Sequence, residues 1–425
     1  MEHTSTPHDT DTTSPWNRGR VGLWLIGARG SVATTVAVGV HALAAGIAPP
    51  TGCTTAGAGF AEVPLPGFDE IVIGGHDVSA VPLGQRAEQL AASGMIPAAI
   101  VAAVRAELDA TDAEIRPAVS DADARQADVI ARLAADIIAF RERHGLAHVT
   151  VVDVSSTEPL PADRPEFHDT ELLAAALADP DRAVLPASSL AGLAAVEAGA
   201  AYACFTPSAG LALPALRAIA QSRIPFAGQD GKTGETLLRT VLAPMFVERG
   251  MHVLSWAGAN LLGGGDGQTL ADPEAVRSKL ASKTRGLQSL VGDHVVAPLH
   301  IDNVPDLGDV KTAWDHVHAE GFLSSRITLQ TTWTAYDSML AAPLVIDLAR
   351  LLSLAGAAGV RGVVPALGCF FKDPWGSDVH AFADQVAALR SWTSDLGEQV
   401  AAAAPVPAPA AREADADPVP IGATR

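Results

Sequence analysis

Short apolar runs that end in glycine or small polar residues recur along the first half of the chain. Each predicts a buried strand, and they lie at residues 21–26, 71–78, 148–154 and 200–205. Between these runs, residues 31–45 and an alanine-rich stretch over 84–146 read as helices, and another helix is expected to open near Leu185. Buried strands that alternate with helices are typical of a parallel α/β sheet.

The second half of the chain has a different pattern. Residues 287–335 suggest strands and short helices of a second domain, and polar and apolar residues alternate over 328–334 as in a half-buried strand. The apolar stretch 340–368 contains three charged residues, which favours a buried helix followed by a strand over a membrane span.

These patterns predict an α/β fold, a doubly wound Rossmann-type parallel sheet with an inserted α+β domain. The polar start of the chain and its Ala/Pro-rich end favour disorder. The expected units are disordered ends at 1–20 and 401–425, a Rossmann domain over 21–230, the inserted domain over 231–336 and a return to the Rossmann domain over 337–400.

A glycine turn follows the first predicted strand and opens the first predicted helix. It consists of Gly27, Ala28, Arg29, Gly30, Ser31 and Val32. A strand, a glycine turn and a helix make the opening of a dinucleotide-binding unit. The fingerprint is imperfect, because Arg29 occupies its second glycine position and Ala33 its last. The motif alone is therefore a weak indication.

A second glycine loop covers residues 226–236 and reads as a strand end, a loop and a helix start. Thr233 is the expected N-cap, and a helix start of this kind attracts phosphate through its free N–H groups. The run Gly231-Lys232-Thr233 is not a P-loop, because Phe226 stands where that motif needs glycine.

Two lysines are placed on one face of a helix that is expected to begin at Asp272. Lys279 and Lys283 are four residues apart and therefore neighbours on the helix surface. On spacing alone a solvated helix end is the commoner explanation, since lysines are mostly exposed.

Three segments, taken in order and spacing, carry a family resemblance, and they are residues 228–236, 260–267 and 277–283. The chain over about 20–385 resembles the myo-inositol phosphate synthases, which are NAD-dependent cyclases of hexose phosphates. Further matching segments lie at 308–311, 336–343 and 370–374.

The resemblance implies roles for the matched residues. NAD is the implied cofactor, and its implied contacts are the glycine turn from Gly27 to Val32, Asp77 at the adenosine ribose, Ser155, and Asp337 at the nicotinamide end. The implied catalytic residues are Lys279, Lys311, Lys372 and Asp230. The residues implied to hold a hexose phosphate are Thr233, Gly234, Glu235, Thr236, Asn260, Asp266 and Lys283. The role of Lys232 stays open.

The implied reaction closes a sugar phosphate into a carbocycle, in the family glucose 6-phosphate to myo-inositol 1-phosphate. Hydride passes to NAD⁺, the new ketone acidifies its neighbouring carbon, the enolate attacks the sugar's own aldehyde, and hydride returns. Negative charge develops on oxygen at each step, and ammonium groups fixed in a dry pocket stabilise it. The family also implies a homotetramer whose contacts lie on the inserted domain.

Several polar positions depart from the family pattern. Gly264 and Gly265 stand where asparagines are usual, Glu235 replaces glutamine, and Tyr336 replaces glutamate. We therefore keep open a related cyclase that makes a five-membered carbocycle from fructose 6-phosphate. An ordinary NAD-dependent sugar phosphate dehydrogenase and a non-catalytic sugar phosphate-binding protein also fit these residues.

The composition limits the kinds of binding partner and the cellular compartment that are expected. A net charge of −19 argues against a nucleic-acid partner or an anionic membrane, but an anionic substrate needs only a local group of lysines. The three cysteines are widely spaced and give no disulfide or metal framework. With no apolar signal core at the start, a reducing cytoplasm is the expected compartment.

Overall fold

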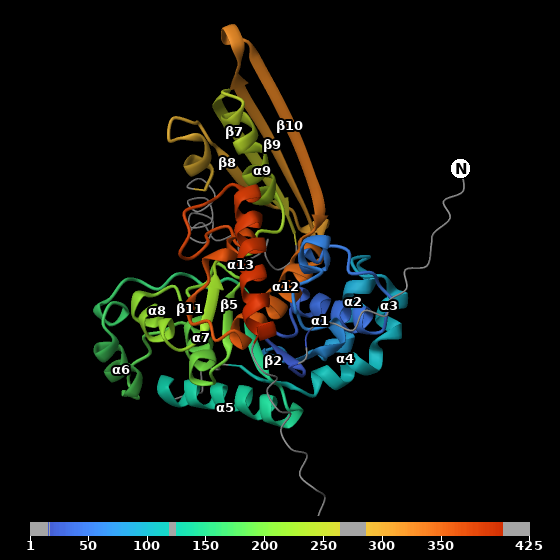
Figure 1. The fold of residues 1–425 in the computed structure, drawn as a ribbon, viewed down its shortest axis with the longest axis vertical. Coiled ribbons are helices and arrows are strands. Elements are labelled where there is room, and N and C mark those ends of the chain that lie inside the picture. The colour runs from blue at the N-terminus through green and yellow to red at the C-terminus, as the bar shows by residue number, and fades with distance from the viewer. Residues whose placement is uncertain (1–15, 17, 119–124, 264–285, 403–425) are drawn as a thin grey trace, which may run out of the picture.

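The computed structural model describes residues 16, 18–118, 125–263 and 286–402 (Figure 1). Its larger sheet is parallel and has the strand order β11-β6-β5-β4-β1-β2-β3. The strands are β1 (Val21–Ile26), β2 (Ile71–Asp77), β3 (Ile115–Pro117), β4 (His148–Asp153), β5 (Ala201–Cys204), β6 (Pro225–Gly228) and β11 (Gly362–Val363). The order from β3 to β6 is that of a doubly wound dinucleotide-binding fold.

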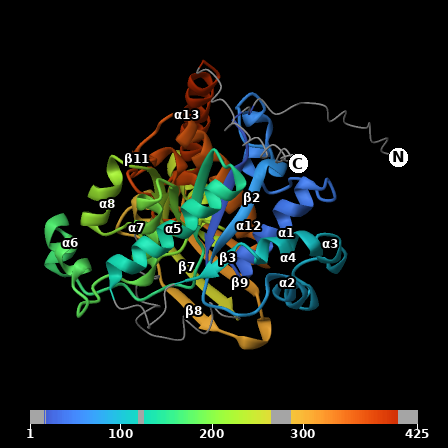
Figure 2. The same ribbon diagram turned by 90° about the horizontal axis from the view of Figure 1, so that it is seen from below.

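Helices cover both faces of this sheet, as its nearly continuous apolar strands require. On one face lie α1 (Ser31–Ala44), α2 (Leu83–Ala92), α3 (Ala98–Ala103), α4 (Arg105–Asp112), α12 (Asp337–Ala357) and α13 (Phe382–Ala402). The other face carries α5 (Gln126–His144), α6 (Thr170–Ala178), α7 (Ala187–Glu197) and α8 (Pro214–Gln221). Figure 2 shows these two groups on opposite sides of the sheet. The predicted fold class is confirmed.

A second sheet projects from one end of the first (Figure 1). It has the order β10-β9-β7-β8 and is mixed, since β7 pairs in parallel with β8 and antiparallel with β9. Its strands are β7 (His252–Leu262), β8 (Leu299–Asn303), β9 (Val310–Glu320) and β10 (Arg326–Tyr336). Helix α9 (Glu235–Glu248) packs on it through Ala243 and Phe246. The predicted domain boundaries at 230 and 336 stay predictions.

Helix α12 returns the chain to the larger sheet. Asp347 is fully buried on this helix and accepts hydrogen bonds from the backbone N–H groups of Thr54 at 2.6 Å and Thr55 at 3.2 Å. Burial raises the pKa of Asp347 to about 6. In the described residues α12 is the one helix long and apolar enough to cross a membrane, but 72% of its apolar window is buried inside the fold, as in a core helix.

The expected N-cap at Thr233 is wrong. Helix α9 begins at Glu235 with Gly234 at its N-cap, so Thr233 lies outside the helix. Helix α12 has Tyr336 at its N-cap, and Asp337 is its first residue. Both side chains are engaged elsewhere, because the Thr233 hydroxyl donates a hydrogen bond to Asp337 at 2.6 Å. This contact joins the second glycine loop to α12.

Candidate active site

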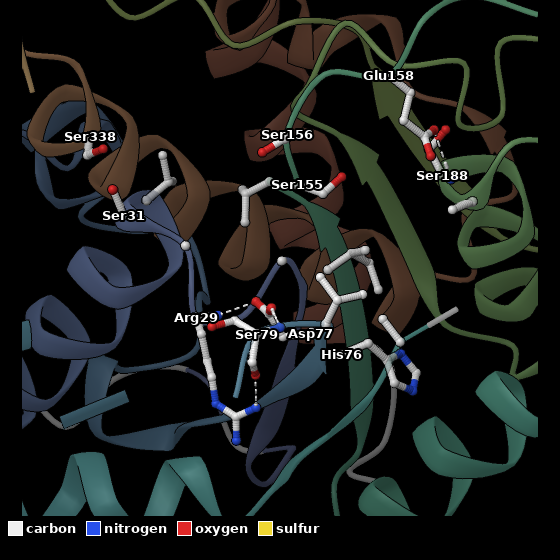
Figure 3. A pocket seen from close by; sticks show the side chains of 18 of the residues that line it. Arg29, Ser31, His76, Asp77, Ser79, Ser155, Ser156, Glu158, Ser188 and Ser338 are labelled. Carbon is white, nitrogen blue, oxygen red and sulfur yellow. Dashed lines mark hydrogen bonds between the residues drawn. The ribbon is translucent and has the colours of Figure 1, made fainter. Parts of the chain in front are cut away.

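A cavity of about 480 Å³ lies beside the first glycine turn (Figure 3), and residues of both sheets line it. Its walls include Gly27 from the turn, Asp77 from the end of β2 and Ser155 from the loop after β4. Lys311 from β9 and Asp337 from the start of α12 also line it. It opens at the carboxyl ends of parallel strands, where ligands bind in folds of this kind.

The glycine turn has the geometry that its sequence predicts. Gly27 has a φ of +81°, and a Cβ atom built on it would lie 2.8 Å from the Cα atom of Ser155. Its N–H donates to the carbonyl of His76 at 2.9 Å, and the N–H of Ala28 shares that acceptor at 3.1 Å. The turn is therefore fixed between β2 and the loop after β4.

Helix α1 points its first turn into the cavity. Its N-cap is Gly30 with no side-chain cap, its first turn has no acidic residue, and Ser31 and Val32 line the cavity wall. An uncapped helix start of this kind fits the pyrophosphate of a dinucleotide. Arg86 on α2 donates to the Ser31 hydroxyl at 2.8 Å and adds a cation that the sequence interpretation missed.

Asp77 organises the loop after β2. One of its carboxylate oxygens accepts from the backbone N–H of Arg29 and the other from that of Ser79, both at 2.6 Å. The predicted contact with an adenosine ribose remains a prediction. The remaining lone pairs of the carboxylate are compatible with it, since each oxygen accepts more than one hydrogen bond.

His76 is a buried packing residue. It accepts a hydrogen bond from the indole N–H of Trp24 at 2.9 Å, and its other ring nitrogen lies 3.1 Å from Asp136. Burial lowers the pKa of His76, with the Asp136 carboxylate opposing that effect. The ring is therefore neutral at pH 7 and donates to Asp136.

The second glycine loop pairs with the segment after residue 370. Backbone hydrogen bonds join Gln229 N–H to the Asp373 carbonyl at 2.7 Å and Lys372 N–H to the Asp230 carbonyl at 2.7 Å. Across this ladder the Lys372 ammonium donates to the Asp230 carboxylate at 2.8 Å. Two residues that are 142 positions apart in sequence are thus a close ion pair, each side chain 11% exposed.

A second lysine–aspartate pair forms at the same loop. The Lys311 ammonium on β9 lies 3.6 Å from the Asp337 carboxylate, whose other oxygen accepts from Thr233. Since Asp230 and Thr233 belong to one loop, the loop connects the Lys372 pair with the Lys311 pair. The predicted gathering of these two lysines beside the cofactor stays a prediction, because Lys311 lines the cavity and Lys372 does not.

Glu235, the unusual anion at the predicted phosphate site, is paired with a buried arginine. Its carboxylate lies 2.5 Å from the Arg239 guanidinium one helical turn later, and Arg239 also donates to Asp315 at 2.9 Å. All three side chains are buried. Burial raises the pKa of Asp315, and Arg239 opposes that effect. The arginine thus offsets the charge of Glu235 at the start of α9.

Asn260 is fully buried on β7, and neither polar atom of its side-chain amide has a partner in the described residues. It pairs in register with Ala313 on β9, which pairs with Trp333 on β10. The Trp333 indole nitrogen also has no partner there, and it lies 3.0 Å from where a Cβ of Gly234 would stand. Leaving buried polar groups without hydrogen bonds costs free energy. The side chains of Asn260 and Trp333 are therefore suited to bind a polar ligand.

Lys232 points away from the cavity. The residue is 3% exposed, and its ammonium donates to Gln385 on α13 at 2.5 Å and lies 5.7 Å from the centre of the Phe382 ring. Its backbone N–H donates to the Phe370 carbonyl at 2.8 Å. This lysine therefore anchors the second glycine loop to α13.

Burial lowers the pKa of Lys232 to about 8, and this shift predicts a pH-dependent stability. The unfolded lysine binds its proton up to about pH 10.4, so between about pH 8 and 10 the unfolded state holds more protons and stability rises with pH. We expect Lys232→Met to remove that rise, which amounts to roughly 2–3 kcal/mol for the wild type. Urea unfolding of both proteins at about pH 7.5, 9 and 10 tests it, and an equal dependence on pH in the two proteins would contradict it.

Other predicted site residues are placed as follows. Thr236 is in the first turn of α9 beside Gly234 and Glu235, and the loop hydroxyl of Ser155 donates to Asp153 at 2.6 Å. Cys204 is buried. Outside the described residues lie Asp266, Lys279, Lys283, Gly264 and Gly265.

The fold and the cavity define a class, a Rossmann-type α/β protein with a second sheet that brings Lys311 and its partner Asp337 to the cavity. A sequence profile of an NAD-binding domain, described as myo-inositol-1-phosphate synthase, matches residues 21–393. The chain belongs to the myo-inositol-1-phosphate synthase family.

Known proteins resemble it over most of their length. Inositol-3-phosphate synthase 1 of Bacteroides thetaiotaomicron is 30% identical over 404 residues, which cover 86% of this chain and 91% of that protein. The crystal structure of inositol-3-phosphate synthase from Caenorhabditis elegans matches with a TM-score of 0.80 at 21% identity, over 90% of this chain and 86% of that one. A myo-inositol-1-phosphate synthase-related protein from Thermotoga maritima gives 0.71 at 22% identity, over 88% and 98%. The two structures support the fold.

Proposed function

We propose that the protein is an NAD-dependent, redox-neutral cyclase that closes a hexose phosphate by an intramolecular aldol reaction. Glucose 6-phosphate is the proposed substrate and a myo-inositol phosphate the product, as the names of the relatives suggest. The observation that carries this proposal is the single cavity that joins the Gly27 turn to Lys311 and Asp337. A dinucleotide lying along it would meet the Lys311–Asp337 pair.

NAD, when bound, accepts a hydride from a substrate alcohol and returns it after ring closure. The residues of the chain supply the rest of the chemistry. The ammonium groups of Lys311 and Lys372 are held by Asp337 and Asp230 and are proposed to stabilise oxygen anions and to move protons between substrate oxygens and carbon. Because each lysine is already fixed by a carboxylate, little reorganisation accompanies the reaction.

The distribution of cations supports a special use of lysine. The chain has only five lysines, at Lys232, Lys279, Lys283, Lys311 and Lys372, and all other cationic side chains apart from histidine are arginines. Among the described lysines, two form pairs at the proposed site and Lys232 anchors its loop. A lysine can titrate near neutral pH when it is buried, whereas arginine stays protonated, so proton transfer favours lysine.

A product assay tests the proposal. The full-length protein is incubated with NAD⁺ and glucose 6-phosphate or fructose 6-phosphate, products are read by NMR, and absorbance at the NADH band is followed. A carbocyclic phosphate with steady absorbance is expected from glucose 6-phosphate. A five-membered carbocycle from fructose 6-phosphate alone supports the related cyclase, stoichiometric NADH supports a dehydrogenase, and binding of both ligands without turnover supports a non-catalytic protein.

A further inference from the structure

Arg29 adjoins the residue proposed to meet the adenosine ribose. Its backbone N–H donates to Asp77, and both residues line the cavity with Ser79 (Figure 3). In dinucleotide-binding folds, an acidic residue after the second strand selects the 2′-hydroxyl of NAD, whereas a nearby arginine accommodates the 2′-phosphate of NADP. This chain has both residue types at that point.

The Arg29 guanidinium is occupied by protein groups. Its Nε and Nη2 atoms donate to the two oxygens of Asp112 at 2.8 and 3.2 Å, and Nη1 donates to the Ser79 carbonyl at 2.8 Å. The Arg29 and Asp112 side chains are 15% and 24% exposed, so this bidentate pair is better shielded from water than a surface ion pair.

Asp112 lies at a position where an acidic side chain does not stabilise the helix. It is the last residue of α4, and a negative charge at a helix C-terminus opposes the helix dipole. Burial acts to raise the pKa of Asp112, but hydrogen bonds from Arg29 and the Leu83 N–H outweigh burial and leave the pKa below its usual value. Asp112 is therefore ionised at neutral pH and neutralises Arg29.

We propose that Asp112 is a specificity-determining residue of the cofactor site, an inference that rests on the proposed NAD binding. By neutralising Arg29 and holding its guanidinium against Ser79, it leaves the Asp77 carboxylate to face the ribose. A 2′-hydroxyl donates to that carboxylate, whereas a 2′-phosphate is repelled by it and finds Arg29 already neutralised by Asp112. The site accordingly favours NAD⁺ over NADP⁺.

Asp112 also accepts a hydrogen bond at 2.9 Å from the Leu83 N–H at the start of α2. Asp112 could therefore have a purely structural role. A structural role would weaken both dinucleotides together. The proposed role changes their ratio, and the change depends on Arg29. The ratio therefore separates the two roles.

The test measures NAD⁺ and NADP⁺ affinity of the full-length protein by calorimetry at low salt. Asp112→Asn is expected to reduce the preference for NAD⁺ by about tenfold or more, mainly through tighter NADP⁺ binding. The matched control is Asp109→Asn on the same helix, whose exposed carboxylate pairs with Arg105, and it should leave the ratio unchanged. In the double variant Arg29→Met/Asp112→Asn the gain of NADP⁺ binding should disappear.

The outcomes test the role of Asp112 separately from the proposed binding of NAD. If the wild type binds neither dinucleotide, both are overturned. If it binds NAD⁺ and Asp112→Asn leaves the ratio as in the control, or the gain persists without Arg29, only the inference is overturned. Should Asp112→Asn fail to fold by circular dichroism, Arg29→Met alone decides. It is expected to bind NADP⁺ no more tightly than the wild type, and tighter binding would refute the inference.

Discussion

Replacing Lys372 with methionine is expected to reduce ring closure by about a thousandfold or more, while the affinity for NAD⁺ stays within about threefold of wild type. The ammonium of Lys372 is fixed by Asp230 at 2.8 Å, but neither residue belongs to the wall of the cavity that contains the glycine turn. Methionine keeps the length of the side chain and removes its charge and protons. Chemistry should therefore be lost and cofactor binding kept.

Product formation by NMR and NAD⁺ binding by calorimetry measure the two halves of this prediction. Lys372→Arg is the matched control for charge, because it keeps a cation that cannot lose its proton. The Lys372→Arg protein should fold and keep the ion pair with Asp230, but it should recover little turnover. A Lys372→Met protein that keeps more than about a tenth of the activity would show that another group carries the charge.

The larger sheet could be predicted from local pattern, and the reason is physical. Strands buried on both faces are apolar throughout, as in Val21–Ile26, and the turn after them requires a residue that tolerates positive φ, which only Gly27 supplies there. A short strand such as Ile115–Pro117 carries too few residues to show a period, and the helical interpretation of 84–146 missed it.

Family motifs in the sequence identify the lysines and aspartates of the proposed site. The hydrogen bonds and ion pairs that these and neighbouring side chains form could not be predicted in the same way. Thr233 matches an N-cap by residue type, but its hydroxyl bonds to Asp337, 104 positions later, and tertiary structure decides such contacts. Likewise, the pairing of Arg29 with Asp112 and of Glu235 with Arg239 depends on side-chain geometry. Only the last pair has a sequence signal, its four-residue spacing on a helix.

Replacing Gly27 with alanine is expected to weaken NAD⁺ binding by about a hundredfold, through backbone strain and a clash together. The φ of +81° disfavours any side chain, and the new methyl would lie 2.8 Å from the Cα atom of Ser155, a backbone atom that cannot rotate away. Relief requires the turn and the Ser155 loop to separate, and both line the cavity.

Gly46→Ala is the matched control, because Gly46 has a φ of +67° and a Cβ there would meet nothing within 4 Å. It carries the backbone strain without the clash, so it should cost roughly 1–2 kcal/mol of stability and leave NAD⁺ affinity unchanged. Thermal unfolding and calorimetric titration of both variants separate the two effects. If Gly27→Ala binds NAD⁺ as tightly as Gly46→Ala does, the turn is not the wall against which the dinucleotide lies, since the same residue change with the same backbone strain would then have no effect specific to the cavity.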